Sequence, residues 1–241
     1  MGSVGLLYVG AVLFVNGLML LGAVPPKSAA ILNLFVGALQ CIVPTAMLIQ
    51  ADGDSAVTLA ASGLYLFGFT YLYVGIGNLA GLDPRGVGWF SIFVAAAAGA
   101  YSLISFTVVD DPVFGVIWLA WAGLWTLFFL VLGAGREELT RFTGWTALLL
   151  SQPTCTLPAF LALTGNLPSS SGAAALWAAG LAALVAVAAT LGLPAARRRC
   201  PILPSSTSAP TNSALQRNQR EERSCDTEIS PRATTPSEWR W

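Results

Sequence analysis

The stretch VFGVIWLAWAGLWTLFFLVL, residues 113–132, decides the fold class of this chain. It has no charged side chain, and it is long enough for an α-helix, which rises 1.5 Å per residue, to cross the roughly 30 Å hydrocarbon core of a membrane. Six further stretches of this kind lie at about residues 4–23, 29–50, 56–79, 87–108, 142–164 and 173–193. The sequence therefore predicts an all-α fold, a polytopic transmembrane helical bundle with seven spans.

The composition of the whole chain agrees with a membrane protein. Of its 241 residues, 55% are hydrophobic and only 10% are charged, and the mean hydropathy is +0.69. A soluble domain carries about 25% charged residues, so this chain has too little charge to cover a water-facing surface. The few charges of the first 194 residues fall in short clusters between the apolar stretches.

The charges of the short loops predict the orientation of the bundle. When the loops are numbered in order, every loop lysine or arginine falls in an odd loop, and the arginine run 197–199 follows the seventh span on that same side. Because basic loops stay in the cytoplasm, we expect the N-terminus outside and the C-terminus inside. From about Cys200 onward, Pro, Ser, Thr, Arg and Glu dominate, so residues 194–241 are predicted to form a disordered cytoplasmic tail.

The absence of Asp, Glu, Lys, Arg and His from all seven spans limits what the protein can do. A charge inside a membrane usually marks an ion path, a proton relay or a ligand counter-ion, so this sequence argues against ion-coupled transport and proton pumping. The chain has no histidine, which excludes a Ser-His-Asp triad and a histidine metal site. We therefore expect no enzyme activity, no metal and no cofactor, and the zero net charge gives no sign of nucleic-acid binding.

Aromatic residues recur at helical spacing in two of the spans. In the third span, Tyr65, Phe69 and Tyr73 are spaced i, i+4, i+8. In the fifth span, the spacing i, i+3, i+7 places three tryptophans on one helix face. Such rings can be core packing, or they can line a narrow slot that admits a flat neutral molecule and replaces part of its hydration. The fifth-span rings are Trp118, Trp121 and Trp125.

Two lone amides and one proline also stand inside spans. Asn16 and Asn33 can each bond a neighbouring helix or contact a solute. Pro153 lies in the middle of the sixth span, where it removes a backbone hydrogen bond and is expected to kink the helix.

Five segments of the chain resemble the AmiS/UreI family. They are LLYVGAVLFVNG (6–17), LFGFTYLY (66–73) with GLD (81–83), WFSIFVA (89–95), IWLAWAGLW (117–125), and FTGW (142–145) with LPAF (157–160). The resemblance covers about residues 2–165. It implies a domain organisation in which residues 1–165 form a six-helix urea/amide channel core, 166–193 add a loop and a seventh transmembrane helix, and 194–241 form the tail.

The resemblance also implies a function and an assembly. Members of the family are channels of the bacterial inner membrane that pass urea or short-chain aliphatic amides by facilitated diffusion. Each protomer is a bundle of three helix hairpins with its own pore, and six protomers form a homohexamer with lipid at its centre. A cytoplasmic amidase beside the channel would drive uptake. On matching positions, the pore-lining, substrate-binding residues here are expected to be Leu6, Leu13, Asn16, Phe69, Tyr73, Trp118, Trp121 and Trp125.

Three departures from the family pattern bear on this expectation. The acid-gated urea channels have a long histidine-bearing loop after the second helix, whereas this chain has only residues 51–55 there, so we expect the amide branch and no acid gating. The glutamate usual in the sixth helix falls at Leu150 and is missing, which bears on conductance. Gly77 stands where an asparagine is expected, with Asn78 following.

Two other functions remain open at this point. A seven-helix carrier of another neutral solute would need two similar three-helix halves, which the sequence does not show. A membrane scaffold or sensor whose pore closed when the sixth-helix carboxylate was lost would show no amide permeability.

Overall fold

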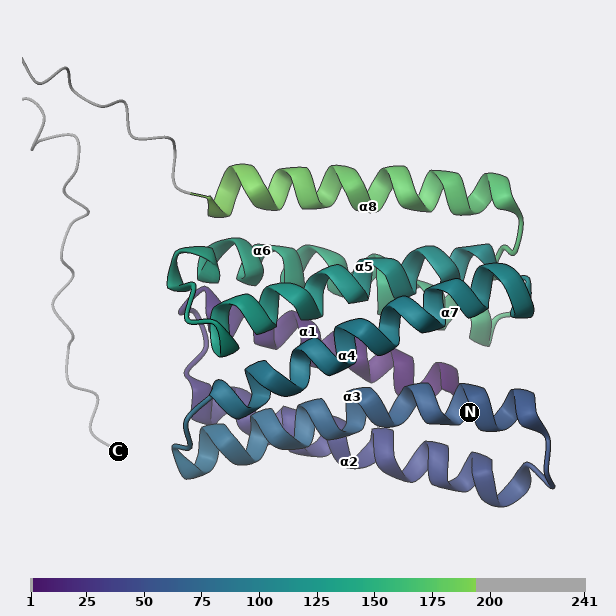
Figure 1. Ribbon diagram of the computed structural model, residues 1–241, viewed down its shortest axis with the longest axis horizontal. Coiled ribbons are helices and arrows are strands. Elements are labelled where there is room, and N and C mark those ends of the chain that lie inside the picture. Colours follow the sequence, from purple (N-terminus) through teal and green to yellow (C-terminus); the bar gives the residue numbers. More distant parts are fainter. Residues whose placement is uncertain (1, 194–241) are drawn as a thin grey trace, which may run out of the picture. The chain divides into compact units, whose positions relative to one another are not determined.

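The computed structural model describes residues 2–193; the predicted tail, 194–241, lies outside the described residues. The described chain is all helical (Figure 1). Its elements are α1 (Gly2–Leu20), α2 (Pro26–Gln50), α3 (Ser55–Ala80), α4 (Arg85–Ile104), the π-helical turn η1 (Ser105–Val109), α5 (Pro112–Phe128), the π-helical turn η2 (Phe129–Gly133), the 3₁₀ turn η3 (Glu137–Leu139), α6 (Thr140–Ser151), the π-helical turn η4 (Gln152–Thr156), α7 (Leu157–Leu163) and α8 (Ser171–Gly192).

The seven predicted spans are confirmed. Seven helices of the described chain are long and apolar enough to cross a membrane, and each falls on one predicted stretch. The sixth runs from Glu137 to Leu163 and contains α6, η4 and α7 in succession. Pro153 stands in η4, so the expected break in this span takes the form of a π-helical turn.

The spans pack as three pairs, with α8 added outside. α2 pairs with α3 and α4 with α5, whereas α1 lies along the sixth span, and α8 packs on α6 and α5 (Figure 1). Only two of the pairs are hairpins, not the three that the family resemblance implied; the third pair joins the first and last core spans and closes the bundle. A glycine stands at each crossing and lets the backbones approach closely. These glycines are Gly17 against Leu148, Gly37 against Leu72, and Gly88 against Gly133.

Local signals fix the ends of the helices at three short loops. The Asp54 side chain accepts hydrogen bonds from the backbone N–H groups of Ala56 and Val57, which starts α3. Gly81, with φ 66°, ends α3 in the left-handed conformation that glycine adopts without strain. Asp111 accepts from the N–H of Phe114 and starts α5.

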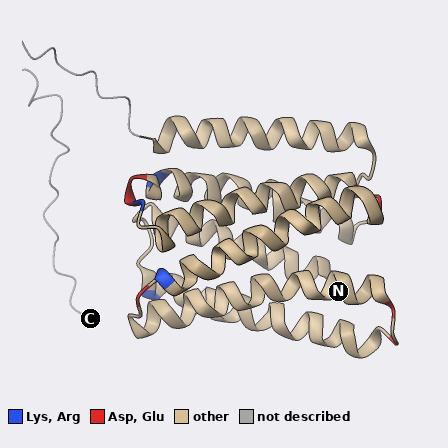
Figure 2. Cartoon of the chain, viewed as in Figure 1, with Lys and Arg blue, Asp and Glu red and all other residues tan. Residues whose placement is uncertain are grey.

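Charge divides the two ends of the bundle. In the described chain all Lys and Arg lie at one end, here called the basic end, beside a few carboxylates (Figure 2). The opposite end, the acidic end, carries only carboxylates, from the α2–α3 loop and the turn before α5. This is the segregation that the loop sequences predict, while the side of the membrane on which each end lies stays a prediction.

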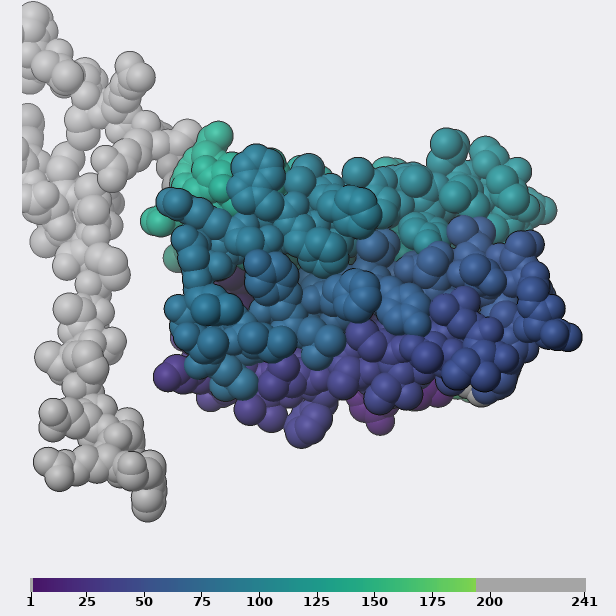
Figure 3. Space-filling view, turned by 60° about the horizontal axis from the view of Figure 1, so that its bottom comes forward, coloured from purple at the N-terminus to yellow at the C-terminus, as the bar shows by residue number. Residues whose placement is uncertain are grey.

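The outer surface of the bundle is apolar. Large rings such as Phe35, Trp89 and Phe93 are more than half exposed on α2 and α4. Figure 3 shows the face formed by α2 and α3 in blue and α4 in teal. A surface of this kind needs lipid or a neighbouring protein against it.

Candidate pore

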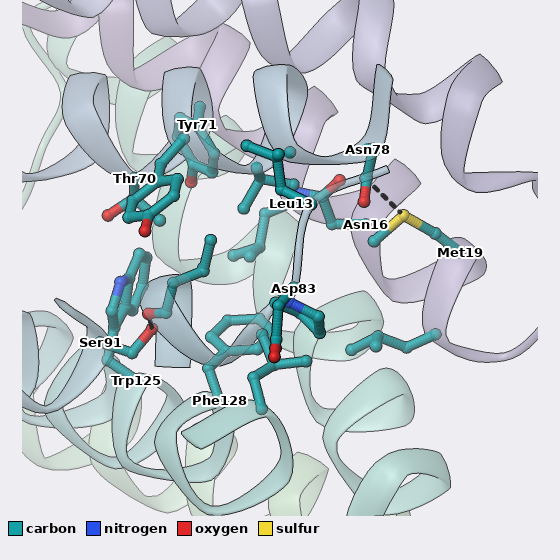
Figure 4. Close-up of a pocket in the computed structure, with 18 residues that line it drawn as sticks. Leu13, Asn16, Met19, Thr70, Tyr71, Asn78, Asp83, Ser91, Trp125 and Phe128 are labelled. Atoms are coloured by element: carbon teal, nitrogen blue, oxygen red, sulfur yellow. Dashed lines mark hydrogen bonds between the residues drawn. The ribbon is translucent and has the colours of Figure 1, made fainter. Parts of the chain in front are cut away.

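Two cavities enter the bundle, one from each end. The basic-end cavity has a volume of about 90 Å³ and is lined by α1, α3, α4 and α5 (Figure 4). The acidic-end cavity has a volume of about 350 Å³ and is lined by α1 to α5. Each exceeds the roughly 10–15 Å³ that one water needs by this measure.

A cluster of rings lies between the two cavities. Phe67 is 4.8 Å from Trp121 and 5.2 Å from Trp125, centroid to centroid, and meets both edge to face. Phe67 and Trp121 border the acidic-end cavity, whereas Trp125 borders the basic-end cavity. All three are at most 2% exposed. The buried ring cluster thus stands between one cavity and the other.

The predicted site residues divide between the cavities, with one exception. The basic-end cavity is lined by Leu13, Asn16, Tyr73 and Trp125, and the acidic-end cavity by Leu6, Trp118 and Trp121. Phe69 lines neither cavity and is 53% exposed. Its ring packs on Tyr65, 5.7 Å away, on the outer face of α3.

The α3 rings that lie at the centre of the bundle are Phe67 and Tyr71, which the sequence analysis did not single out. They are i, i+4 partners on a different face from Phe69, stacked 6.4 Å apart, and both are buried. The segment LFGFTYLY contains both series at the same spacing, so periodicity alone does not choose between them. α3 packs closely on α2, with Gly68 against the Gln40 backbone, which turns Phe67 and Tyr71 toward the centre of the bundle. Phe69 then lies outside, whereas Tyr73, near the end of the helix, reaches the basic-end cavity.

The two asparagines bond each other. Asn16 Nδ2 donates to Asn33 Oδ1 at 2.9 Å, and Asn33 Nδ2 donates back to Asn16 Oδ1 at 2.7 Å. Asn33 Nδ2 also donates to the Ala29 carbonyl. Of the two uses predicted for these amides, the structure shows the helix-to-helix bond, although Asn16 also borders the basic-end cavity.

Other polar groups of the cavity walls have no hydrogen-bond partner within the described residues. The Tyr71 hydroxyl and the Trp125 indole N–H are fully buried and unpaired beside the basic-end cavity. In Figure 4 their rings lie on opposite sides of the cavity. A buried polar group without a partner costs free energy, so these two groups in the cavity wall call for an explanation.

The sixth span holds Trp121 in place. Trp121 Nε1 donates to Thr154 Oγ1 at 3.1 Å, and Thr154 Oγ1 donates to the Leu150 carbonyl at 2.7 Å. From α8, Trp177 Nε1 donates to the Pro153 carbonyl at 2.9 Å. The π-helical turn is thus bonded on one side to the ring cluster and on the other to the seventh span.

The position of the missing glutamate is apolar. Leu150 is buried and lines neither cavity. Gln152 is exposed and bonds Ser151, so it does not take over the carboxylate's place.

Comparison with known proteins gives one consistent result. Residues 1–166 match the model of the AmiS/UreI family of transporters. The chain is 74% identical over 196 residues to the transporter protein AmiS2 of Rhodococcus erythropolis, covering 81% of this chain and 95% of that protein. It is 50% identical over 210 residues to a transporter protein for amidate substrates of Mycolicibacterium smegmatis, covering 87% and 96%.

More distant matches are urea channels. The acid-activated urea channel of Helicobacter pylori is 37% identical over 184 residues, which cover 65% of this chain and 94% of the channel. The crystal structure of the H. pylori urea channel superposes with a TM-score of 0.63 at 32% identity, covering 70% of this chain and all of that one. The cryo-EM structure of its closed state gives a TM-score of 0.62 at 34% identity, covering 68% and 98%.

Proposed function

The chain belongs to the AmiS/UreI family of transporters, and on this premise we propose that it is a passive channel for small neutral amides and urea. It is a transport protein, not an enzyme. The observation that carries the proposal is the uncharged ring cluster of Phe67, Trp121 and Trp125 between two cavities of opposite ends.

The ring cluster suits a flat neutral solute. The three rings meet edge to face, so a planar molecule can slide along ring surfaces while losing part of its water shell. Tyr71 Oη and Trp125 Nε1 are free to replace some of the lost hydrogen bonds. An ion would find no counter-charge at this depth, since the rings and their neighbours are uncharged.

We propose the following site and setting. The lining consists of the predicted residues other than Phe69, together with Phe67 and Tyr71. The family model ends at residue 166, which supports a core of residues 1–165 with α8 as an addition. The basic end is cytoplasmic, the membrane is the bacterial inner membrane, and an amidase consumes the solute. The exposed rings of α2 and α4 support contact with lipid or with further copies, which we propose form a ring of six.

Purified protein in liposomes is expected to raise acetamide and urea permeability at least about tenfold over empty liposomes, a barrier difference of ~1.4 kcal/mol. Stopped-flow light scattering measures this directly. Sodium acetate, a charged solute of similar size, should show no increase. Saturation at low concentration with counterflow would instead identify a carrier, and permeability equal to that of empty liposomes would identify a non-conducting protein.

The acetamide flux is expected to vary less than about twofold between pH 5 and pH 8, because the chain lacks histidine, the side chain that ordinarily changes charge in this range. The short α2–α3 loop also leaves no room for a histidine-bearing gate. The same liposome assay at matched internal and external pH tests this. A steep rise in flux on acidification would show a gate built from other groups.

A further inference from the structure

Gln40 is a buried side chain whose amide makes no hydrogen bond within the described residues. It lies on α2 with a relative exposure of 0%. Neither its Oε1 nor its Nε2 has a hydrogen-bond partner among residues 2–193. Burying a carboxamide without partners costs free energy, so a sequence that retains one at this depth calls for an explanation.

The position of Gln40 supplies that explanation. It borders the acidic-end cavity together with Leu6, Phe67 and Trp121, so it lies beside the ring cluster. Gly5 of α1 leaves the space that the amide occupies: a Cβ at Gly5 would overlap Gln40 Oε1 and lie 3.1 Å from its Cδ. The backbone of Gln40 in turn packs on Gly68, the residue after Phe67.

The same helix shows what a carboxamide does here when it has a partner. Asn33 lies seven residues before Gln40, two turns away on the same face of α2. Its amide exchanges two hydrogen bonds with the amide of Asn16, at 2.9 and 2.7 Å. At the level of Gln40, α1 offers Gly5 in place of an amide, so the equivalent pairing is left open.

We propose that Gln40 is a specificity-determining residue that pairs with the carboxamide of the passing solute. Its Nε2 donates to the solute carbonyl while its Oε1 accepts from a solute N–H, as Asn16 and Asn33 do for each other. This selects primary amides and urea over neutral solutes of equal size, because only they present an acceptor and a donor in one plane. The inference rests on the proposed channel function and names the side chain that recognises the solute carboxamide by hydrogen bonds.

The test compares acetamide with ethylene glycol, which has the same number of non-hydrogen atoms but no carboxamide. Gln40→Met keeps the length of the side chain and removes the amide. We expect acetamide permeability in liposomes to fall about tenfold, the effect of losing one or two neutral hydrogen bonds. Ethylene glycol permeability should change less than about twofold. Gln50→Met, at the exposed end of the same helix, is the matched control and should change neither.

A second variant changes Gly5, the α1 residue that faces the Gln40 amide. Gly5→Ala leaves Gln40 in the chain but displaces its amide, so it should lower the ratio of acetamide to ethylene glycol permeability in the same direction. Gly123→Ala, where an added Cβ meets nothing within 4 Å, is its control. Parallel loss of both solutes in Gln40→Met would show that Gln40 only shapes the pore. If the wild type conducts amides and Gln40→Met has the same ratio of acetamide to ethylene glycol permeability, the inference alone is overturned. If the wild type shows no amide permeability, the channel function is overturned with it.

Discussion

Trp121→Ala is expected to raise the permeability of bulky neutral amides such as butyramide at least about tenfold relative to acetamide, a change of ~1.4 kcal/mol in the barrier difference. The indole of Trp121 lies 4.8 Å from the Phe67 ring and 4.9 Å from Trp118 and is 2% exposed. Its removal takes away one wall of the ring cluster at the inner end of the acidic-end cavity. The passage then becomes wider, and the selection against larger amides that its narrowness provides is lost. Stopped-flow measurements with a series of amides of increasing size give the ratio.

Two further variants separate widening from damage. Trp89→Ala removes a tryptophan that is 61% exposed and packs on Phe129, outside both cavities, so it should leave the size selectivity unchanged. Trp121→Leu keeps an apolar filler and should give an intermediate ratio. Equal ratios in the wild type and Trp121→Ala, with both proteins folded, would show that the solute path does not pass this ring.

The aromatic series of α3 shows where sequence reasoning stops. Hydrophobicity and length predict the span, and the structure confirms it. Within LFGFTYLY, however, Phe67 with Tyr71 and Phe69 with Tyr73 have the same i, i+4 spacing and the same chemistry. Which pair faces the centre depends on how α3 rotates against α2, and that depends on small residues such as Gly68, which packs on the Gln40 backbone. Such glycines are the signal that distinguishes the two faces.

The fifth span has a single aromatic series, so its spacing alone predicts which face lies inside. Trp118, Trp121 and Trp125 occupy one face, and all three border a cavity. Partnerships between distant segments are different, since no local pattern encodes them. For Asn16 and Asn33 the sequence allowed either a bond between helices or a contact with solute, and the structure shows the bond. The bond from Trp121 to Thr154 depends on a π-helical turn whose geometry Pro153 alone does not specify. The role of these side chains in solute passage stays a prediction.

The close crossing of α4 with η2, the last turn of the fifth span, should be a sensitive packing contact of the bundle. A Cβ at Gly88 would overlap the Gly133 nitrogen and lie 2.5 Å from the Gly133 Cα and 2.6 Å from the Leu132 carbonyl carbon. These are backbone atoms, so no side chain can rotate away and the two helices must separate. Gly88→Ala is therefore expected to cost at least about 2 kcal/mol, within the range found for overpacked cores.

The thermal midpoint of detergent-solubilised protein, followed by size-exclusion chromatography, measures this cost and should fall by several degrees. Gly99→Ala in the same helix is the matched control, because an added Cβ there meets nothing within 4 Å and alanine favours the helix. The separation also reaches the pore: Val87 and Leu132, the neighbours of the two glycines, both line the basic-end cavity. Gly88→Ala should thus alter amide flux as well as stability. A variant as stable as Gly99→Ala would mean that α4 and η2 do not cross this closely, and that the width of the basic-end cavity is set elsewhere.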